Sequence, residues 1–188
     1  MAEAPRDAQR MLQIWPTIVG VVFAAALILI LYIGLADTDI PGEVLIAAAF
    51  VYLGSAALGH RAAAWPLFCA TFVLIGIGIA VEPFSPFWTM IVIVAALVVY
   101  GLVRGRLQPT WGLPLQAVAM LVVIALALLV PVLPAPWGAV LVGTGLLLHA
   151  GWDVHHLRTR RVVASTMAEF CVALDTCLAV GVVVLALR

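Results

Sequence analysis

Side chains that could carry out acid–base or metal chemistry gather in one short stretch, HAGWDVHHLRTRR, at residues 149–161. This stretch contains three of the four histidines of the chain, one aspartate and three arginines. Imidazole and carboxylate groups are common ligands of Zn²⁺ and similar divalent metals, and they are also common general acids and bases. The stretch is therefore the first candidate for a functional site.

Three of these side chains share a face if the stretch is helical. At about 100° per residue, His149, Asp153 and His156 lie on one side of the helix, and His155 points elsewhere. His149 and His156 are separated by about 10.5 Å of rise, and Asp153 between them can pair with either. This separation disfavours the two histidines as direct neighbours on one ion. Because their side chains are of the ligand types that Zn²⁺ or a similar divalent metal uses, we predict His149, Asp153 and His156 as metal ligands.

Two acidic residues of the next apolar segment lie at matching depths if that segment runs back beside the first. Counted from the loop between them, Glu169 falls near the depth of Asp153, and Asp175 falls near that of His149. The two carboxylates are about 120° apart around their helix, so both could edge one pocket without facing it squarely. We predict Asp153, Glu169 and Asp175 as catalytic candidates, one of them acting as a general base.

Three arginines, Arg158, Arg160 and Arg161, follow the histidines. Guanidinium groups bind phosphate through paired hydrogen bonds, so we predict that these three hold a phosphate or a lipid headgroup. The alternative is an interfacial anchor that grips membrane lipids. For His149 and Asp153, the alternative to a functional role is a hydrogen bond that joins two helices.

The composition of the whole chain explains why these polar groups stand out. Of 188 residues, 66% are hydrophobic and 10% are charged, whereas soluble domains are about half apolar and a quarter charged. We therefore expect an all-α integral membrane protein. Net charge is zero, so no overall field attracts nucleic acid. The chain has no lysine, which excludes a retinal Schiff base.

Seven apolar segments, separated by loops rich in proline and glycine, predict seven transmembrane helices, because a spanning helix needs about 20 apolar residues. Together they would form one polytopic membrane domain over residues 1–188. The predicted spans are 14–35, 43–60, 64–82, 87–103, 114–132, 137–156 and 165–187.

The arginines predict the orientation of these spans. With seven spans, eight of the nine arginines fall on the side of the N-terminus, and only Arg188 falls on the other. The opposite side carries Asp37, Asp39, Glu43 and Glu82. Because positive residues are retained inside, we predict a cytoplasmic N-terminus and an external C-terminus in the plasma or inner membrane.

A weak internal repeat is also visible, with matches such as His60 and His155 at a shift of 95 residues. Residues 12–82 and 107–188 would then be two parallel three-helix copies joined by the fourth helix, as in some transporters. Chance matches between apolar strings are the alternative. The candidate site residues have no counterparts in the first copy, which favours one fixed centre over a transport path built from both halves.

Three classes of active function remain open, beside a purely structural or accessory membrane subunit. We favour a metal- or acid/base-dependent enzyme that acts on a lipid or polyprenyl substrate, with its site between the last two helices in the cytoplasmic half. The second class is a proton- or metal-coupled transporter or channel, because chains of intramembrane Asp, Glu and His relay protons. The third is a b-type haem protein in which His60 pairs with His149 or His156.

Overall fold

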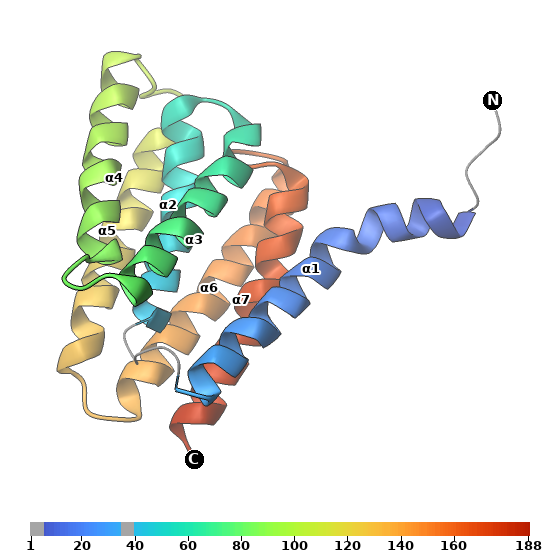
Figure 1. Ribbon diagram of the computed structural model, residues 1–188. Coiled ribbons are helices and arrows are strands. Elements are labelled where there is room, and N and C mark those ends of the chain that lie inside the picture. Colours follow the sequence, from blue (N-terminus) through green and yellow to red (C-terminus); the bar gives the residue numbers. More distant parts are fainter. Residues whose placement is uncertain (1–5, 35–39) are drawn as a thin grey trace.

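The computed structural model describes residues 6–34 and 40–188, and the side chains of 14–34 and 42–188. Over these ranges the chain forms seven α-helices and two short 3₁₀ turns, Arg61–Ala63 and Val130–Val132, and no strand (Figure 1). The helices are α1 (Arg6–Tyr32), α2 (Ile40–Leu58), α3 (Ala64–Ala80), α4 (Pro86–Val103), α5 (Leu113–Leu129), α6 (Trp137–Thr159) and α7 (Ser165–Ala186).

Each predicted span corresponds to one of these helices. α1 differs most, because it begins at Arg6 rather than at residue 14. Hydropathy detects only the apolar part of a helix, whereas a helical backbone continues through polar residues. The predicted loop residues Asp37 and Asp39 lie outside the described residues.

Among the described residues, five helices are long and apolar enough to cross a membrane. This identifies a membrane-embedded protein but falls short of the predicted seven spans. They are Ile14–Tyr32, Arg61–Ala80, Pro86–Val103, Leu113–Val132 and Ser165–Ala186. The apolar part of α2, Gly42–Leu58, is shorter. α6 carries the polar cluster of residues 149–161 near its end, and this lowers its hydropathy.

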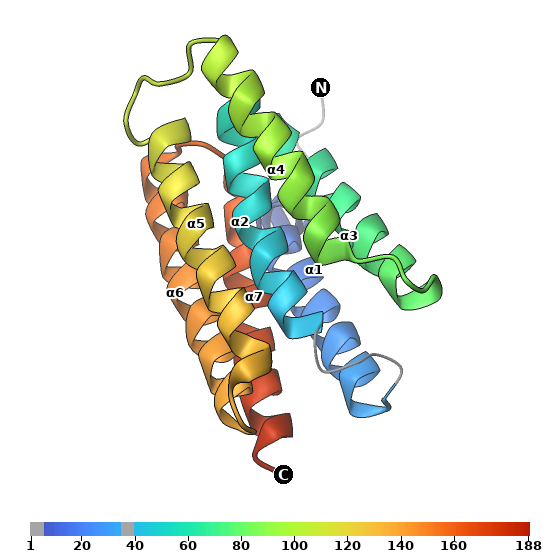
Figure 2. The same ribbon diagram turned by 90° about the vertical axis from the view of Figure 1, so that its left-hand side faces the viewer.

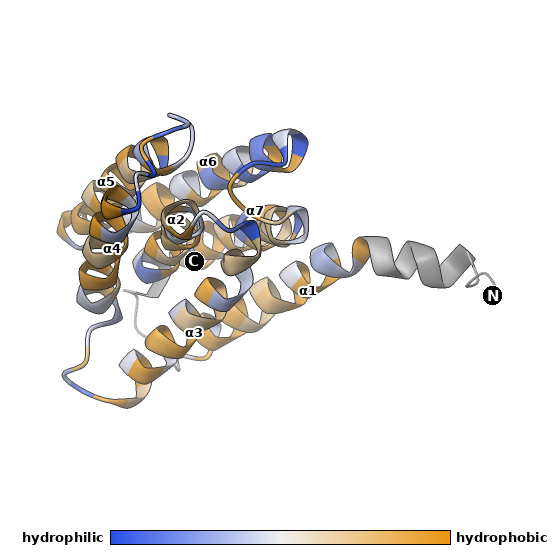
Figure 3. Cartoon of the chain, turned by 90° about the horizontal axis from the view of Figure 1, so that it is seen from above, coloured by the Kyte–Doolittle hydropathy of each residue, from blue (hydrophilic) through white to orange (hydrophobic). Residues whose placement is uncertain are grey.

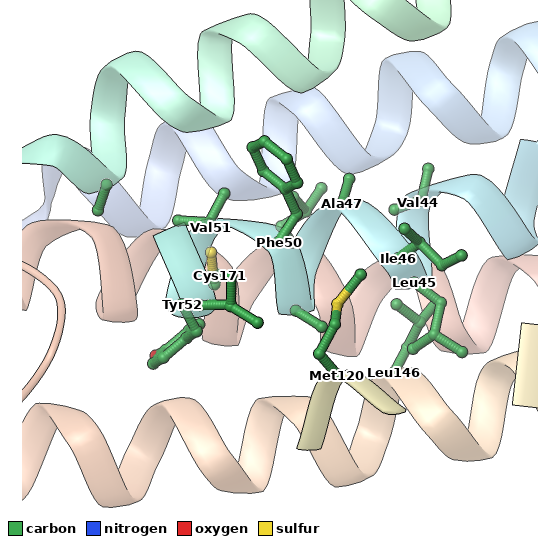
Figure 4. Packing of buried hydrophobic residues seen from close by; sticks show 14 of the residues in the cluster. Val44, Leu45, Ile46, Ala47, Phe50, Val51, Tyr52, Met120, Leu146 and Cys171 are labelled. Carbon is green, nitrogen blue, oxygen red and sulfur yellow. The ribbon is translucent and has the colours of Figure 1, made fainter. Parts of the chain in front are cut away.

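Helix α2 forms the centre of the bundle. It packs against α3, α4, α5 and α6 (Figure 2). Its side chains are buried along most of its length, and Figure 4 shows them directed to several sides, toward Met120 of α5, Leu146 of α6 and Cys171 of α7. A helix that is hydrophobic all round is expected in this central place.

Helix α7 lies between α6 and α1 and makes its most extensive contacts with these two. Glycine allows the close approach of α1: a Cβ on Gly20 would lie 2.5 Å from the backbone oxygen of Phe170. Gly143 likewise allows the close approach of α6 to α7, because a Cβ on Gly143 would lie 3.2 Å from the backbone oxygen of Ala179. Small residues at such contacts let helix backbones pack closely within a membrane.

The outer surface of the bundle is apolar, as lipid contact requires. Val92 of α4 is 69% exposed and Leu121 of α5 is 66% exposed. Figure 3 shows hydrophobic residues along the outer helices, whereas hydrophilic residues gather near the α6–α7 connection.

The predicted internal repeat of residues 12–82 and 107–188 is not confirmed. The repeat would make α2 and α6 equivalent. However, α2 is surrounded by other helices, whereas α6 exposes Leu147 and Leu148 to 50% and 70% on the surface.

We predict that Gly20→Ala weakens the contact of α1 with α7. The new methyl group meets backbone rather than a flexible side chain, so we expect a loss of about 1–3 kcal/mol in the free energy of unfolding. Unfolding of the purified protein by dodecyl sulfate, followed by circular dichroism, measures the change.

Gly76→Ala in α3 is the matched control, because no atom lies within 4 Å of its added Cβ. This change should be neutral or stabilising by up to about 1 kcal/mol. Equal stabilities of the two variants would contradict the close approach of α1.

Candidate metal centre

The candidate site begins with two side chains on one face of α6. His149 and Asp153 are one turn apart, and His149 Nε2 lies 3.8 Å from Asp153 Oδ1. The side chain of Asp153 is fully buried, and that of His149 is 9% exposed. The predicted pairing of these residues is therefore present.

Asp175 of α7 completes a group of three. Its side chain is buried, with the residue 1% exposed. One nitrogen of His149 and one carboxylate oxygen each from Asp153 and Asp175 lie within 4.8 Å of one another. Because α6 and α7 are antiparallel neighbours, residues at matching distances from their connection meet, as the sequence predicted for Asp175 and His149.

Tyr52 of α2 is a further member of the site. Its hydroxyl donates a hydrogen bond of 2.5 Å to Asp153 Oδ1, across 101 residues of sequence. Its ring lies edge-on to His149 and to His156, with centroid distances of 5.3 and 4.8 Å. Sequence reasoning missed Tyr52, although a tyrosine within the apolar segment 43–60 was the available signal.

The three grouped side chains each retain an atom without a hydrogen-bond partner. These buried atoms are His149 Nε2, Asp153 Oδ2 and Asp175 Oδ2. Unpaired buried polar atoms are rare and costly, and two buried carboxylates close together are costly unless a proton or a cation neutralises them. The arrangement therefore has unused ligand atoms and an excess of acidic groups at one point.

His156, the third predicted metal ligand, lies outside this group. Its Nδ1 is 3.0 Å from the backbone oxygen of Trp152, one turn earlier. The residue is buried, with 3% of its surface exposed. The structure thus brings His149 and Asp153 together with Asp175 rather than with His156.

Glu169, the remaining predicted catalytic residue, faces a different helix. It accepts a hydrogen bond of 2.7 Å from the hydroxyl of Thr17 on α1. Glu169 and Asp175 are six residues apart and therefore about 120° apart around α7. As a result, Asp175 faces α6 and Glu169 faces α1.

The predicted phosphate ligands divide into two sets. Arg160 and Arg161 line a cavity at the end of the bundle, together with His60. The guanidinium of Arg161 lies 5.0 Å from the centre of the Trp111 ring. Arg158 is exposed and is not among the lining residues.

No known protein family matches the chain, and no curated protein or solved structure shows detectable similarity to it. The interpretation of the site therefore rests on its geometry.

We predict that Tyr52→Phe destabilises the protein by about 1–3 kcal/mol, because it leaves Asp153 Oδ1 without its hydrogen-bond donor in a buried setting. The free energy of unfolding in dodecyl sulfate measures this loss. Tyr100→Phe is the control, since Tyr100 is 44% exposed and should change stability by less than about 0.5 kcal/mol. A Tyr52→Phe variant as stable as the control would show that the bond contributes nothing.

Proposed function

We propose that the chain is a membrane-embedded enzyme that binds a divalent metal through His149, Asp153 and Asp175 and acts on a lipid or polyprenyl substrate. The observation that supports this proposal is the set of three buried ligand atoms within 4.8 Å of one another, from side chains that each keep an unpaired atom. A bound cation would neutralise the carboxylates and satisfy these atoms at once.

The ligand chemistry favours Zn²⁺ or a similar metal. One imidazole and two carboxylates suit Zn²⁺, whereas Mg²⁺ and Ca²⁺ prefer oxygen ligands alone. Bonds to Zn²⁺ of about 2.0–2.2 Å place tetrahedral ligand atoms about 3.3–3.6 Å apart. Side-chain rotations must therefore bring atoms that now lie up to 4.8 Å apart closer by up to about 1.5 Å. Three protein ligands leave a fourth position for water, as in catalytic rather than structural zinc sites.

Such a site supports hydrolysis. A metal held by His149, Asp153 and Asp175 would supply a water activated as a nucleophile near neutral pH. A carboxylate oxygen not used for the metal would accept the proton, and Asp175 is the better candidate because Asp153 Oδ1 already accepts the hydroxyl of Tyr52. The Tyr52 bond would hold Asp153 in position for the metal.

The surroundings favour a lipid substrate. The centre lies among helices whose outer faces are apolar, so lipid chains would surround the bundle that encloses it. The arginines at the nearby end would interact with membrane lipids and hold a polar headgroup. Arg160 and Arg161 keep this proposed role, whereas Arg158 is exposed, does not line the cavity and takes the alternative role of an interfacial anchor.

A transporter is the second candidate, on one observation. Polar side chains follow one another from Tyr52 to Asp153 and His149, through a hydrogen bond and then a 3.8 Å contact, with Asp175 beside them. Chains of this kind relay protons in membrane pumps and transporters. Haem binding has less support, because His60 is exposed and lines the cavity at the end of the bundle.

We further propose that all seven helices span a plasma or inner membrane, with the N-terminus in the cytoplasm. The connections that contribute Arg61, Arg106, Arg160 and Arg161 meet at one end of the bundle, where the four residues line one cavity. By the positive-inside rule this end is cytoplasmic. α2 would then cross the membrane surrounded by other helices, and α6 would cross it with Leu147 and Leu148 exposed on the outer surface.

The protein purified in dodecyl maltoside should contain about one divalent metal ion per chain, as measured by elemental mass spectrometry. We expect His149→Ala, Asp153→Asn and Asp175→Asn each to lower metal affinity at least tenfold, because each removes one of the three ligands.

Glu169→Gln is the matched control, since it changes a carboxylate on the same helix that bonds to Thr17, and it should retain the metal. A metal-free, colourless wild-type protein that also fails to bind added Zn²⁺ would rule out the metal enzyme and leave the proton relay. A red sample with a haem spectrum would favour the third class.

Alkaline phosphatase fusions test the orientation, because this enzyme is active only outside the cytoplasm. Fusion after Leu107, in the α4–α5 connection, should be inactive, and fusion after Arg188 should be active. Activity of both fusions, or of the first alone, would contradict the proposed topology.

A further inference from the structure

A second polar site lies at the arginine-rich end of the bundle. It is a cavity of about 310 Å³ between the α2–α3, α4–α5 and α6–α7 connections. Four arginines line it, Arg61, Arg106, Arg160 and Arg161, and no acidic residue is among its lining residues. A concave site lined by one sign of charge concentrates ions of the opposite sign.

Two buried polar groups of this cavity have no hydrogen-bond partner. They are the hydroxyl of Ser55, a residue only 1% exposed, and Nε of Arg106. Among the side chains described, five buried polar atoms lack partners; three belong to the metal centre and the other two to this cavity. A hydroxyl and a guanidinium N–H can both donate, so these groups require an acceptor.

The local structure holds the arginines at the cavity wall. Arg106 Nη2 donates to the backbone oxygen of Leu58 at 3.4 Å. Its guanidinium packs over Gly59, where any Cβ would overlap it and where φ is +64°. Arg61 Nε donates to the backbone oxygen of Val163 at 3.4 Å, so positive charge is positioned before any ligand arrives.

We propose that this cavity binds a phosphate group. Phosphate carries only acceptor oxygens, and its geometry suits the paired donors of arginine. The volume is at the lower end of the range for small-molecule pockets, about 300–1,000 Å³, so it admits a phosphate with a few attached atoms. The phosphate is either free in solution or part of a lipid headgroup.

The position of Ser55 links this site to the metal centre. Ser55 lies three residues after Tyr52 on α2, on the same face and about 4.5 Å further along the axis. Tyr52 in turn bonds to Asp153. If the proposed enzyme function holds, the cavity binds the phosphate group of a lipid substrate. The bonds next to that phosphate group would then lie toward the metal centre. Phosphate binding itself does not depend on that function.

Isothermal titration calorimetry of the full chain in dodecyl maltoside tests the proposal. The probes are inorganic phosphate and a short-chain phosphatidic acid, at constant ionic strength in chloride. We expect saturable binding of at least one probe, and a loss of affinity of at least about tenfold in Ser55→Ala and in Arg161→Ala. Ser55→Ala removes only an unpaired hydroxyl, so the fold is expected to remain intact.

Arg104→Ala and Arg158→Ala are the matched controls, because both residues flank the cavity in sequence but do not line it. They should change affinity by less than about threefold, through screened long-range charge alone. Equal losses in the controls and in Arg161→Ala would overturn the proposal in favour of general charge attraction. Failure of both probes to bind would also overturn it.

The two probes distinguish the source of the phosphate. Binding of the lipid alone identifies a headgroup site, and binding of both probes with similar affinity identifies a site for free phosphate. Asp153→Asn separates this proposal from the metal centre: it should retain phosphate binding while losing metal. A protein that binds phosphate but no metal would contradict the proposed enzyme function and support the proposed phosphate site.

Discussion

The hydrogen bond from Tyr52 to Asp153 is the interaction on which the rest of the site depends. A buried carboxylate in an apolar bundle is costly unless it has partners. Tyr52 supplies one partner from the central helix α2, and its ring packs against His149 and His156. The bond therefore ties α2 to α6 at the level where the carboxylates of Asp153 and of Asp175 on α7 come together.

The cost of burying a polar group without partners also applies to the other unpaired polar atoms of the molecule. Among the described side chains, the buried polar atoms without hydrogen-bond partners occur in two places rather than scattered through the core. One set, around Asp153 and Asp175, is rich in acceptors and suits a cation. The other set, around Ser55 and Arg106, contains donors and suits an anion. Helix α2 contributes Tyr52 to the first and Ser55 to the second, so one rigid element fixes their separation.

Helical periodicity and depth allowed part of this site to be predicted from the sequence. Spacing alone put His149 and Asp153 on one face, and counting from the loop brought Asp175 to the depth of His149. Periodicity could not find Tyr52, because α2 is apolar on all sides and its rotation is decided by packing against four helices. The same argument explains why His156 and Glu169 lie outside the group of His149, Asp153 and Asp175. A shared helix face or a shared depth does not determine which neighbouring helix a side chain contacts. The helices themselves were predictable because long apolar runs have few other stable forms in lipid.

Anomalous X-ray diffraction from crystals of the zinc-loaded protein, recorded on both sides of the zinc absorption edge, tests the central claim most directly. The account predicts one strong anomalous peak within about 2.0–2.2 Å of His149, Asp153 and Asp175 side-chain atoms, with Tyr52 still bonded to Asp153. A map without a peak there, or with zinc bound instead at His60 or His155 on the surface, would contradict the account.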